Sequence, residues 1–342
     1  MSDSDAISAD SLGPNHYNAL SKAIHQVLTT DLAIETYAQI IDGLPLCDVA
    51  WNRYQHRLCQ KHPINSHKSL CPGSIEKASS LKNSLDLSWL SYDDKLLRSY
   101  RASPPGSLAF GRQILELVAV AVHKTAIYLF RKDFRLHDQH YWDNDGLSIQ
   151  NVTSWQSVPM DNNIFKTVEP WPTLFTHPAF TAYEQYPNGV ADMVGYWAED
   201  RILGGVLLFD RTKDGGNGAS GYEPNVYLQS SRPKRTYLIY QLTDAQQQSL
   251  LDFLLLPTPP VPLSETSNPK IPAPSCLLPL LFSSENLVSI DPEFAVVNNK
   301  IYRDVWERPP PRPYQGLIRD RDVVDTPGAG DTELEKLRRL GL

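Results

Sequence analysis

The longest apolar stretch of the chain, residues 108–130, constrains the fold more than any other feature. A run of this length favours a buried helix, although its β-branched end, Thr125–Phe130, is also compatible with a strand. Glu116, His123 and Lys124 interrupt the run, whereas a membrane span needs about 18 to 20 apolar residues in succession. Hydrophobic residues make up 41% of the 342-residue chain, so a core able to surround such a helix is available.

The two halves of the chain carry different patterns. The first 130 residues show the spacing of three to four residues that is typical of helices, and the region after residue 185 contains short strand-like runs. Thr243-Asp-Ala-Gln246 has the form of a capping box that opens another helix. The predicted helices are 16–40, 48–60, one or two within 84–101, and 244–256; the predicted strands are 189–198 and 201–210, joined as a hairpin, then 225–230 and 235–241.

These elements predict an α+β fold, in which a helical N-terminal half packs on an antiparallel β-meander covered by a helix. The predicted organisation has four parts. They are a disordered leader (1–15), a mainly helical region (16–130), an antiparallel sheet region with its covering helix (131–256), and a Pro-rich extended segment with a C-terminal tail (257–342).

Charge and cysteine content exclude several classes of protein. The net charge is −7 and no long run of Lys or Arg occurs, so a nucleic-acid partner is not expected. The acidic, polar N-terminus has neither the basic start and apolar run of a secretory signal nor the Arg-rich character of a transit peptide. Four cysteines do not form a disulfide scaffold in a chain of this length. We therefore expect a cytoplasmic protein, without excluding the nucleus, and no membrane partner.

Two blocks of the sequence resemble a known group of proteins. Residues 187–211, Pro-Asn-Gly-Val-Ala-Asp-Met-Val-Gly-Tyr-Trp-Ala-Glu-Asp-Arg-Ile-Leu-Gly-Gly-Val-Leu-Leu-Phe-Asp-Arg, and residues 301–308, Ile-Tyr-Arg-Asp-Val-Trp-Glu-Arg, are similar to blocks in a family of uncharacterised proteins from filamentous fungi. The resemblance covers about residues 170–310. It implies a fungal source and allows a role in specialised metabolism, and it brings no activity and no catalytic residues.

One group of residues has a spacing close to that of a small zinc site. Cys59, His62, His67 and Cys71 could supply the four nitrogen and sulfur ligands that a structural zinc ion needs. The gaps of two, four and three residues depart from the zinc-knuckle spacing, and the glycines that let such a loop close are missing. The alternative is a polar loop with two buried thiols.

A second polar segment lies between the helical half and the predicted sheet. It runs from Asp133 to Gly146 and contains His137 and His140 with several carboxylates. Such residues could form a metal site with two histidines and one carboxylate, but the His-x-Asp start of that signature is absent. The alternatives are a proton-transfer role for one of the histidines and a simple polar connection.

A third group combines aromatic and acidic residues, the composition of a small-molecule cleft. His177, Glu184 and Asp192 are the candidate catalytic residues, which would handle protons. The candidate ligand-binding residues are Tyr183, Tyr196 and Trp197. Asp192 needs an explanation because it lies in an apolar run, where a buried carboxylate is costly unless paired. The alternative to a catalytic role is an ion pair with Arg201 or Arg211.

Two functions follow as predictions, and the sequence leaves open whether the protein is an enzyme. The first is a protein that binds a small organic molecule, or an enzyme of fungal specialised metabolism, with a cleft between the two halves. The second is a non-catalytic protein whose Pro-rich segments, 257–279 and 308–313, bind a protein partner. Structural zinc is compatible with both.

Overall fold

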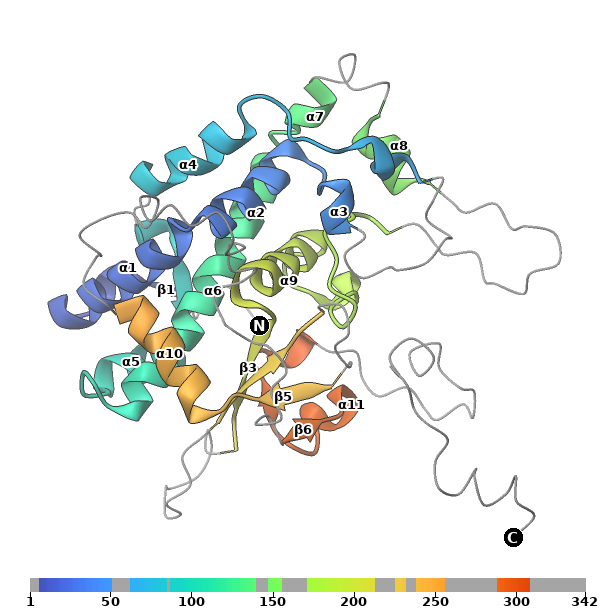
Figure 1. The fold of residues 1–342 in the computed structure, drawn as a ribbon. Coiled ribbons are helices and arrows are strands. Elements are labelled where there is room, and N and C mark those ends of the chain that lie inside the picture. Colours follow the sequence, from blue (N-terminus) through green and yellow to red (C-terminus); the bar gives the residue numbers. More distant parts are fainter. Residues whose placement is uncertain are drawn as a thin grey trace, which may run out of the picture.

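A computed structural model describes residues 6–50, 62–84, 87–139, 147–155, 171–212, 225–231, 238–255 and 288–307 (Figure 1). The helices are α1 (Pro14–Leu28), α2 (Asp31–Asp42), α3 (Cys47–Ala50), α4 (Ser74–Ser84), α5 (Asp94–Ala102), α6 (Leu108–Lys132), α7 (Leu136–Gln139), α8 (Ile149–Thr153), α9 (Val190–Leu203), α10 (Asp244–Leu255) and α11 (Pro292–Ala295). The strands are β1 (Ala6–Ser8), β2 (Ser91–Asp93), β3 (Val206–Asp210), β4 (Val226–Gln229), β5 (Ile239–Gln241), β6 (Ser289–Ile290) and β7 (Ile301–Tyr302).

The predicted core helix is present as α6, which runs through the middle of the helical half (Figure 1). Ser107 caps its first turn by accepting a hydrogen bond from the N–H of Phe110, and Asp133 ends it in the left-handed conformation. The strand alternative for residues 125–130 is therefore wrong. The segment Leu108–Gln139 is long and apolar enough to cross a membrane, but 72% of its most apolar window lies buried inside the protein, as in a core helix.

The helix predicted over 16–40 is in fact two helices. The first ends at its C-cap Thr29, and Thr30 starts the second as the N-cap of α2, because its side chain accepts a hydrogen bond from the N–H of Ala33. The leader was also predicted wrongly in part. Residues 6–8 form β1, which pairs with β2 in antiparallel register, so that Ile7 lies opposite Tyr92.

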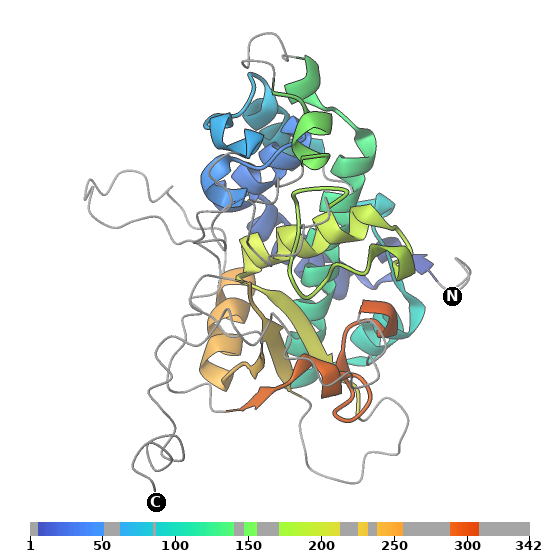
Figure 2. The same cartoon turned by 90° about the vertical axis from the view of Figure 1, so that its right-hand side faces the viewer.

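The predicted hairpin over 189–210 is wrong in its first strand. Residues 190–203 form the helix α9, which is followed directly by β3. Nearly every side chain of α9 is buried, so the segment lacks the polar face from which a helix is recognised. Gly204 ends it in the left-handed conformation, with φ of 91°. Figure 2 shows α9 lying above the sheet.

The five-stranded sheet is antiparallel, in the order β6-β5-β4-β3-β7, and its central strands β3 and β4 are buried on both faces. Residues alternate between the faces, as strand geometry requires. Leu207, Phe209, Val226 and Leu228 face the main core, which also contains side chains of α1, α2, α6 and α9. Val206, Leu208, Tyr227 and Ile239 face a second core, formed with Phe180, Tyr196 and Ile301.

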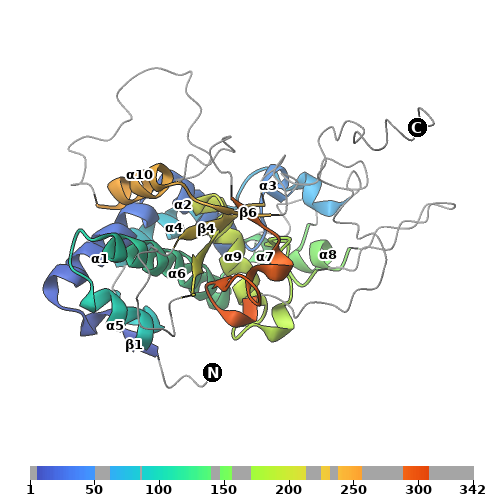
Figure 3. The same cartoon turned by 90° about the horizontal axis from the view of Figure 1, so that it is seen from below.

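Helix α10 begins at the predicted capping box. The side chain of Thr243 accepts from the N–H of Gln246, and the side-chain oxygen of Gln246 accepts from the N–H of Thr243. Leu250 and Leu254 of α10 join the main core, while the segment 288–307 contributes to the second core on the other side of the sheet (Figure 3). The fold is thus α+β, with a helical N-terminal half packed on an antiparallel sheet.

Candidate metal centre

Three segments that are far apart in the sequence each bring one buried ligand residue to the same place. Asp42 is the last residue of α2, His67 follows the 3-10 turn Pro63–Ser66, and His137 lies in α7. One ligand atom from each lies within 4.8 Å of the other two, and the three residues are at most 3% exposed. Figure 1 shows α7 at the end of the molecule away from the five-stranded sheet.

The carboxylate of Asp42 is held in place by hydrogen bonds to one of its two oxygens. Oδ1 accepts hydrogen bonds from the N–H of Cys71 at 2.8 Å and from the hydroxyl of Ser74 at 3.2 Å. Oδ2 is buried and has no hydrogen-bond partner. Gly43, with φ of 103°, ends α2 directly after Asp42 and turns the chain away, so the carboxylate points out of the helix end.

The ring of His67 is oriented by a backbone carbonyl. Its Nδ1–H donates to the oxygen of Pro45 at 2.8 Å, which leaves Nε2 facing Oδ2 of Asp42 at 3.1 Å. These two atoms face each other as an ion pair, and neither has a hydrogen-bond partner elsewhere among the described residues. Burial lowers the pKa of His67, but Asp42 and the Pro45 carbonyl outweigh it, so the pKa lies above its ordinary value.

The ring of His137 is oriented in the same way. Its Nε2–H donates to the carbonyl oxygen of Leu147 at 3.0 Å, and its Nδ1 lies 3.6 Å from Oδ2 of Asp42. Burial holds the pKa of His137 below its ordinary value, which favours the neutral ring that a metal ion requires. The rings of His67 and His137 are 4.7 Å apart and nearly perpendicular, so their nitrogens converge without stacking.

Two buried atoms of this cluster, Oδ2 of Asp42 and Nε2 of His67, have no hydrogen-bond partner outside the cluster among the described residues. A buried polar atom that lacks a partner costs about 1 to 3 kcal/mol, more when it is charged, and native structures contain few of them. Histidines that bind metals generally donate their second ring N–H to a carbonyl or carboxylate, as both histidines do here. The cluster therefore has the inner and outer contacts of a metal centre.

The sequence prediction of a zinc site named part of this cluster. His67 lies in it and Cys71 lies beside it, with Sγ 3.5 Å from Nδ1 of His137. His62 does not belong to it: its Nδ1 accepts from the N–H of Ile64, and its ring packs against Trp155. Cys59 lies outside the described residues. The structure instead adds Asp42 and His137. The sequence signal for Asp42 was a carboxylate at a helix end before a glycine, and His137 had been grouped with its own neighbours.

Asp192, the candidate catalytic carboxylate, has a structural partner that the sequence did not reveal. It lies in the first turn of α9, where its Oδ1 is 2.9 Å from Nε2 of His123 and its Oδ2 accepts from the N–H of Asn188. Among the contacts of the described residues, Asp192 is paired with His123 and Asn188 in place of the predicted Arg201 or Arg211. Burial raises the pKa of Asp192, but the contacts with His123 and Asn188 outweigh it and hold the pKa below its ordinary value.

The other two candidate catalytic residues do not join Asp192. His177 is buried; its Nδ1 accepts from the N–H of Ala179, and its Nε2 lies 3.7 Å from Oδ1 of Asp200. Glu184 is exposed to solvent. No contact between His177, Glu184 and Asp192 is seen among the described residues, so they do not form the predicted proton-handling group.

The three candidate ligand-binding aromatics also separate. Trp197 is in the main core against Phe175, whereas Tyr196 is in the second core, stacked on Phe180. Neighbouring residues of a helix point about 100° apart, so the helix α9 sends them to opposite cores. Tyr183 is half-buried at the edge of the second core. Tyr196 and Trp197 are at most 4% exposed and are packed against other side chains.

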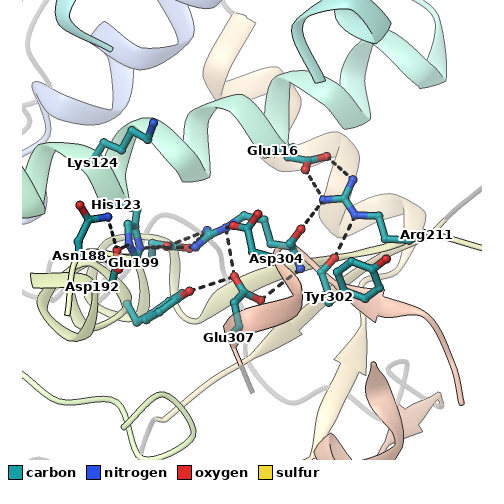
Figure 4. A network of polar contacts seen from close by, with 12 residues as sticks. Glu116, His123, Lys124, Asn188, Asp192, Glu199, Arg211, Tyr302, Asp304 and Glu307 are labelled. Carbon is teal, nitrogen blue, oxygen red and sulfur yellow. Dashed lines mark hydrogen bonds and ion pairs between the residues drawn. The ribbon is translucent and has the colours of Figure 1, made fainter. Parts of the chain in front are cut away.

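A buried charged network surrounds His123, where α6, α9 and the segment 301–307 meet (Figure 4). Nδ1 of His123 lies 2.7 Å from Oε1 of Glu199, and Nη1 of Arg303 contacts both oxygens of that carboxylate at 2.8 Å. The guanidinium of Arg303 also lies 3.3 Å from Glu307, which accepts from the hydroxyl of Tyr196. Because the charged groups contact opposite charges, the network has the character of a structural clamp.

A second ion pair extends the clamp. Arg211, after β3, pairs with Glu116 of α6, and it also donates to the carbonyl oxygens of Tyr302 and Arg303 at 3.1 Å (Figure 4). The segment that contains β7 is thus bound by side chains from three other elements.

No family model, no curated protein and no solved structure matches this chain. The resemblance to fungal proteins consequently stays a prediction.

Proposed function

We propose that the protein binds a divalent transition-metal ion, with Zn²⁺ as the first choice, through Asp42, His67 and His137. The observation that carries the proposal is the pair of buried atoms Oδ2 of Asp42 and Nε2 of His67, which face each other at 3.1 Å and have no hydrogen-bond partner elsewhere among the described residues. A cation between them and Nδ1 of His137 would satisfy both at once.

The chemistry of the donor set favours zinc. Two imidazole nitrogens and one carboxylate oxygen suit zinc and neighbouring transition metals, whereas calcium and magnesium prefer oxygen ligands alone. In a tetrahedral zinc site the ligand bonds of about 2.0 to 2.2 Å place nitrogen and oxygen ligands about 3.3 Å apart. The distances from Oδ2 of Asp42 to the two histidine nitrogens, 3.1 and 3.6 Å, bracket that value.

The competing interpretation is a metal-free ion pair between Asp42 and a protonated His67. The raised pKa of His67 is compatible with it. It gives no role to the second ring, that of His137, whose Nδ1 lies 3.6 Å from the same carboxylate oxygen.

The test is metal content and affinity. The purified full chain is stripped with a chelator, dialysed and titrated with Zn²⁺, while elemental analysis measures the metal bound per chain. We expect one Zn²⁺ per chain. Losing an outer-shell partner already weakens metal binding about 10- to 100-fold, so removing a direct ligand with Asp42→Asn should weaken it by more than about 100-fold.

The matched control is His62→Gln, which changes a buried histidine of the same loop that lies outside the cluster. This variant should bind zinc like the wild type. A chain that binds no zinc in the micromolar range, or that binds it equally well after Asp42→Asn, contradicts the proposal. Circular dichroism of each variant separates loss of metal binding from loss of folding.

A further inference from the structure

Cys71 lies next to the three-residue cluster. Its side chain is 5% exposed, and its Sγ is 3.5 Å from Nδ1 of His137. Because the Nε2–H of that ring is used by Leu147, Nδ1 is the acceptor and the thiol is the donor. The same residue orients Asp42, since its backbone N–H binds Oδ1 and leaves Oδ2 for the centre of the cluster.

The position of the sulfur matches a tetrahedral site. A Zn–S bond of about 2.3 Å and a Zn–N bond of about 2.0 to 2.1 Å place the two ligand atoms about 3.5 Å apart at the tetrahedral angle. This is the distance found between Sγ of Cys71 and Nδ1 of His137. The ligand atoms of Asp42, His67 and His137 lie within 4.8 Å of one another, and the sulfur lies beside this group, at the separation of two zinc ligands from His137.

Charge points to the same role. A divalent ion bound by Asp42 and two neutral histidines would leave a net charge of +1 in a buried site, which is costly. A thiolate as the fourth ligand neutralises the centre. As the metal–sulfur bond forms, the S–H bond of Cys71 breaks and its proton is released to solvent, so metal binding lowers the pH of an unbuffered solution.

We propose that Cys71 is the fourth protein ligand, which closes the coordination sphere and makes this a structural zinc centre. The inference rests on the proposed metal binding and deepens it. A site with three protein ligands keeps a position for water or substrate and is typical of catalysis, whereas four protein ligands are typical of structural zinc. A thiolate also selects zinc and cobalt over manganese and magnesium.

The closed site would hold together segments whose own hydrophobic core at this place is small. The satellite core beside it contains four buried side chains, Leu44, Ile64, Leu147 and Val152. The ion would join the end of α2 to the segments carrying His67, Cys71 and His137, beside that small core. Its structural role therefore concerns the end of the molecule away from the five-stranded sheet.

Cobalt substitution tests the inference directly. Co²⁺ bound to a thiolate gives a near-ultraviolet sulfur-to-metal charge-transfer band, which nitrogen and oxygen ligands do not give. We expect this band in the wild-type chain and its loss in Cys71→Ser, with zinc affinity at least tenfold weaker. Cys47→Ser and Cys59→Ser are the matched controls, and both should keep the band.

Each result separates the two proposals. Stoichiometric cobalt binding without the band overturns the role of Cys71 and leaves a three-ligand site. A band that survives Cys71→Ser but disappears in Cys59→Ser also overturns it. Absence of metal binding in every variant refutes the proposed function itself. X-ray absorption of the zinc-loaded wild type needs no variant, and it should show one sulfur neighbour at about 2.3 Å.

Discussion

Gly195→Ala should destabilise the protein, although alanine is the better helix former. Gly195 lies inside α9 beneath the ring of His123, and a Cβ at this position would lie 2.5 to 2.6 Å from three atoms of that ring. The ring cannot move aside without losing an ion pair, because Asp192 and Glu199 contact its two nitrogens at 2.9 and 2.7 Å. The glycine thus makes room for the ion pairs between α6 and α9.

The expected magnitude follows from two opposing effects. Replacing a helical glycine by alanine stabilises a helix by about 1 kcal/mol. Displacing the His123 ring breaks a buried ion pair, which costs about 3 to 5 kcal/mol when one partner is lost. The net change in the free energy of unfolding is therefore a loss of about 2 to 4 kcal/mol. Urea denaturation followed by circular dichroism measures it.

Two companion variants make the reasoning refutable. Gly111→Ala in α6 is the matched control, because the nearest atom is the flexible end of Leu251, and stability should change by less than about 1 kcal/mol. In a His123→Ala background the space above residue 195 is open, so Gly195→Ala should be neutral or stabilising. An equal cost in both backgrounds, or no cost in the wild type, would refute the proposed close packing.

Three further results are expected. The pKa of His123 is raised, because hydrogen bonds to two carboxylates outweigh the effect of burial. The contribution of His123 to the free energy of unfolding is therefore full below about pH 6.5 and is lost as the pH rises through the pKa of the folded state. His123→Gln should flatten that part of the pH profile of unfolding. Arg303→Met leaves the Glu199 carboxylate without its guanidinium partner, so it should cost about 3 to 5 kcal/mol and speed amide exchange in residues 301–307, as hydrogen-exchange mass spectrometry would show. Gly43→Ala forces alanine into the left-handed region and against Ile149, so it should lower the melting temperature and reduce the stabilisation by added zinc.

The sequence predicted the fold class because local signals dominate it. The apolar run of α6 and the capping box of Thr243 are read within a few residues, and both are confirmed. The helix α9 was missed because it is buried on all sides, so its apolar residues show neither the helical nor the strand period. The two glycines that follow it were the available sign of a helix end.

The site was predicted only where its residues are close in sequence. His67 and Cys71 lie in one loop, so their spacing indicated a metal site. Asp42 and His137 reach the same point through the packing of α2 and α7, which no local pattern shows. Asp192 was singled out as a buried carboxylate in need of a partner, but that partner, His123, depends on how α6 and α9 pack.

The structure bears on the two functions predicted from the sequence in different ways. A small-molecule cleft would need the aromatic and acidic side chains to surround a shared space. In the structure, Tyr196 and Trp197 are packed into separate cores. The Pro-rich segments 257–279 and 308–313 lie outside the described residues, so binding of a protein partner through them stays a prediction.

The two buried polar clusters differ in the partners of their ring nitrogens and carboxylates. Around His123 each ring nitrogen faces a carboxylate, and Arg303 completes the charge balance, so the network stabilises the fold without needing a ligand. Around Asp42 and His67, two buried atoms lack hydrogen bonds, although their neighbours are fixed by backbone groups. These oriented ligand atoms face only one another, so a metal ion would bind them without breaking other hydrogen bonds, and the free energy of folding and the affinity for zinc should be linked at this site.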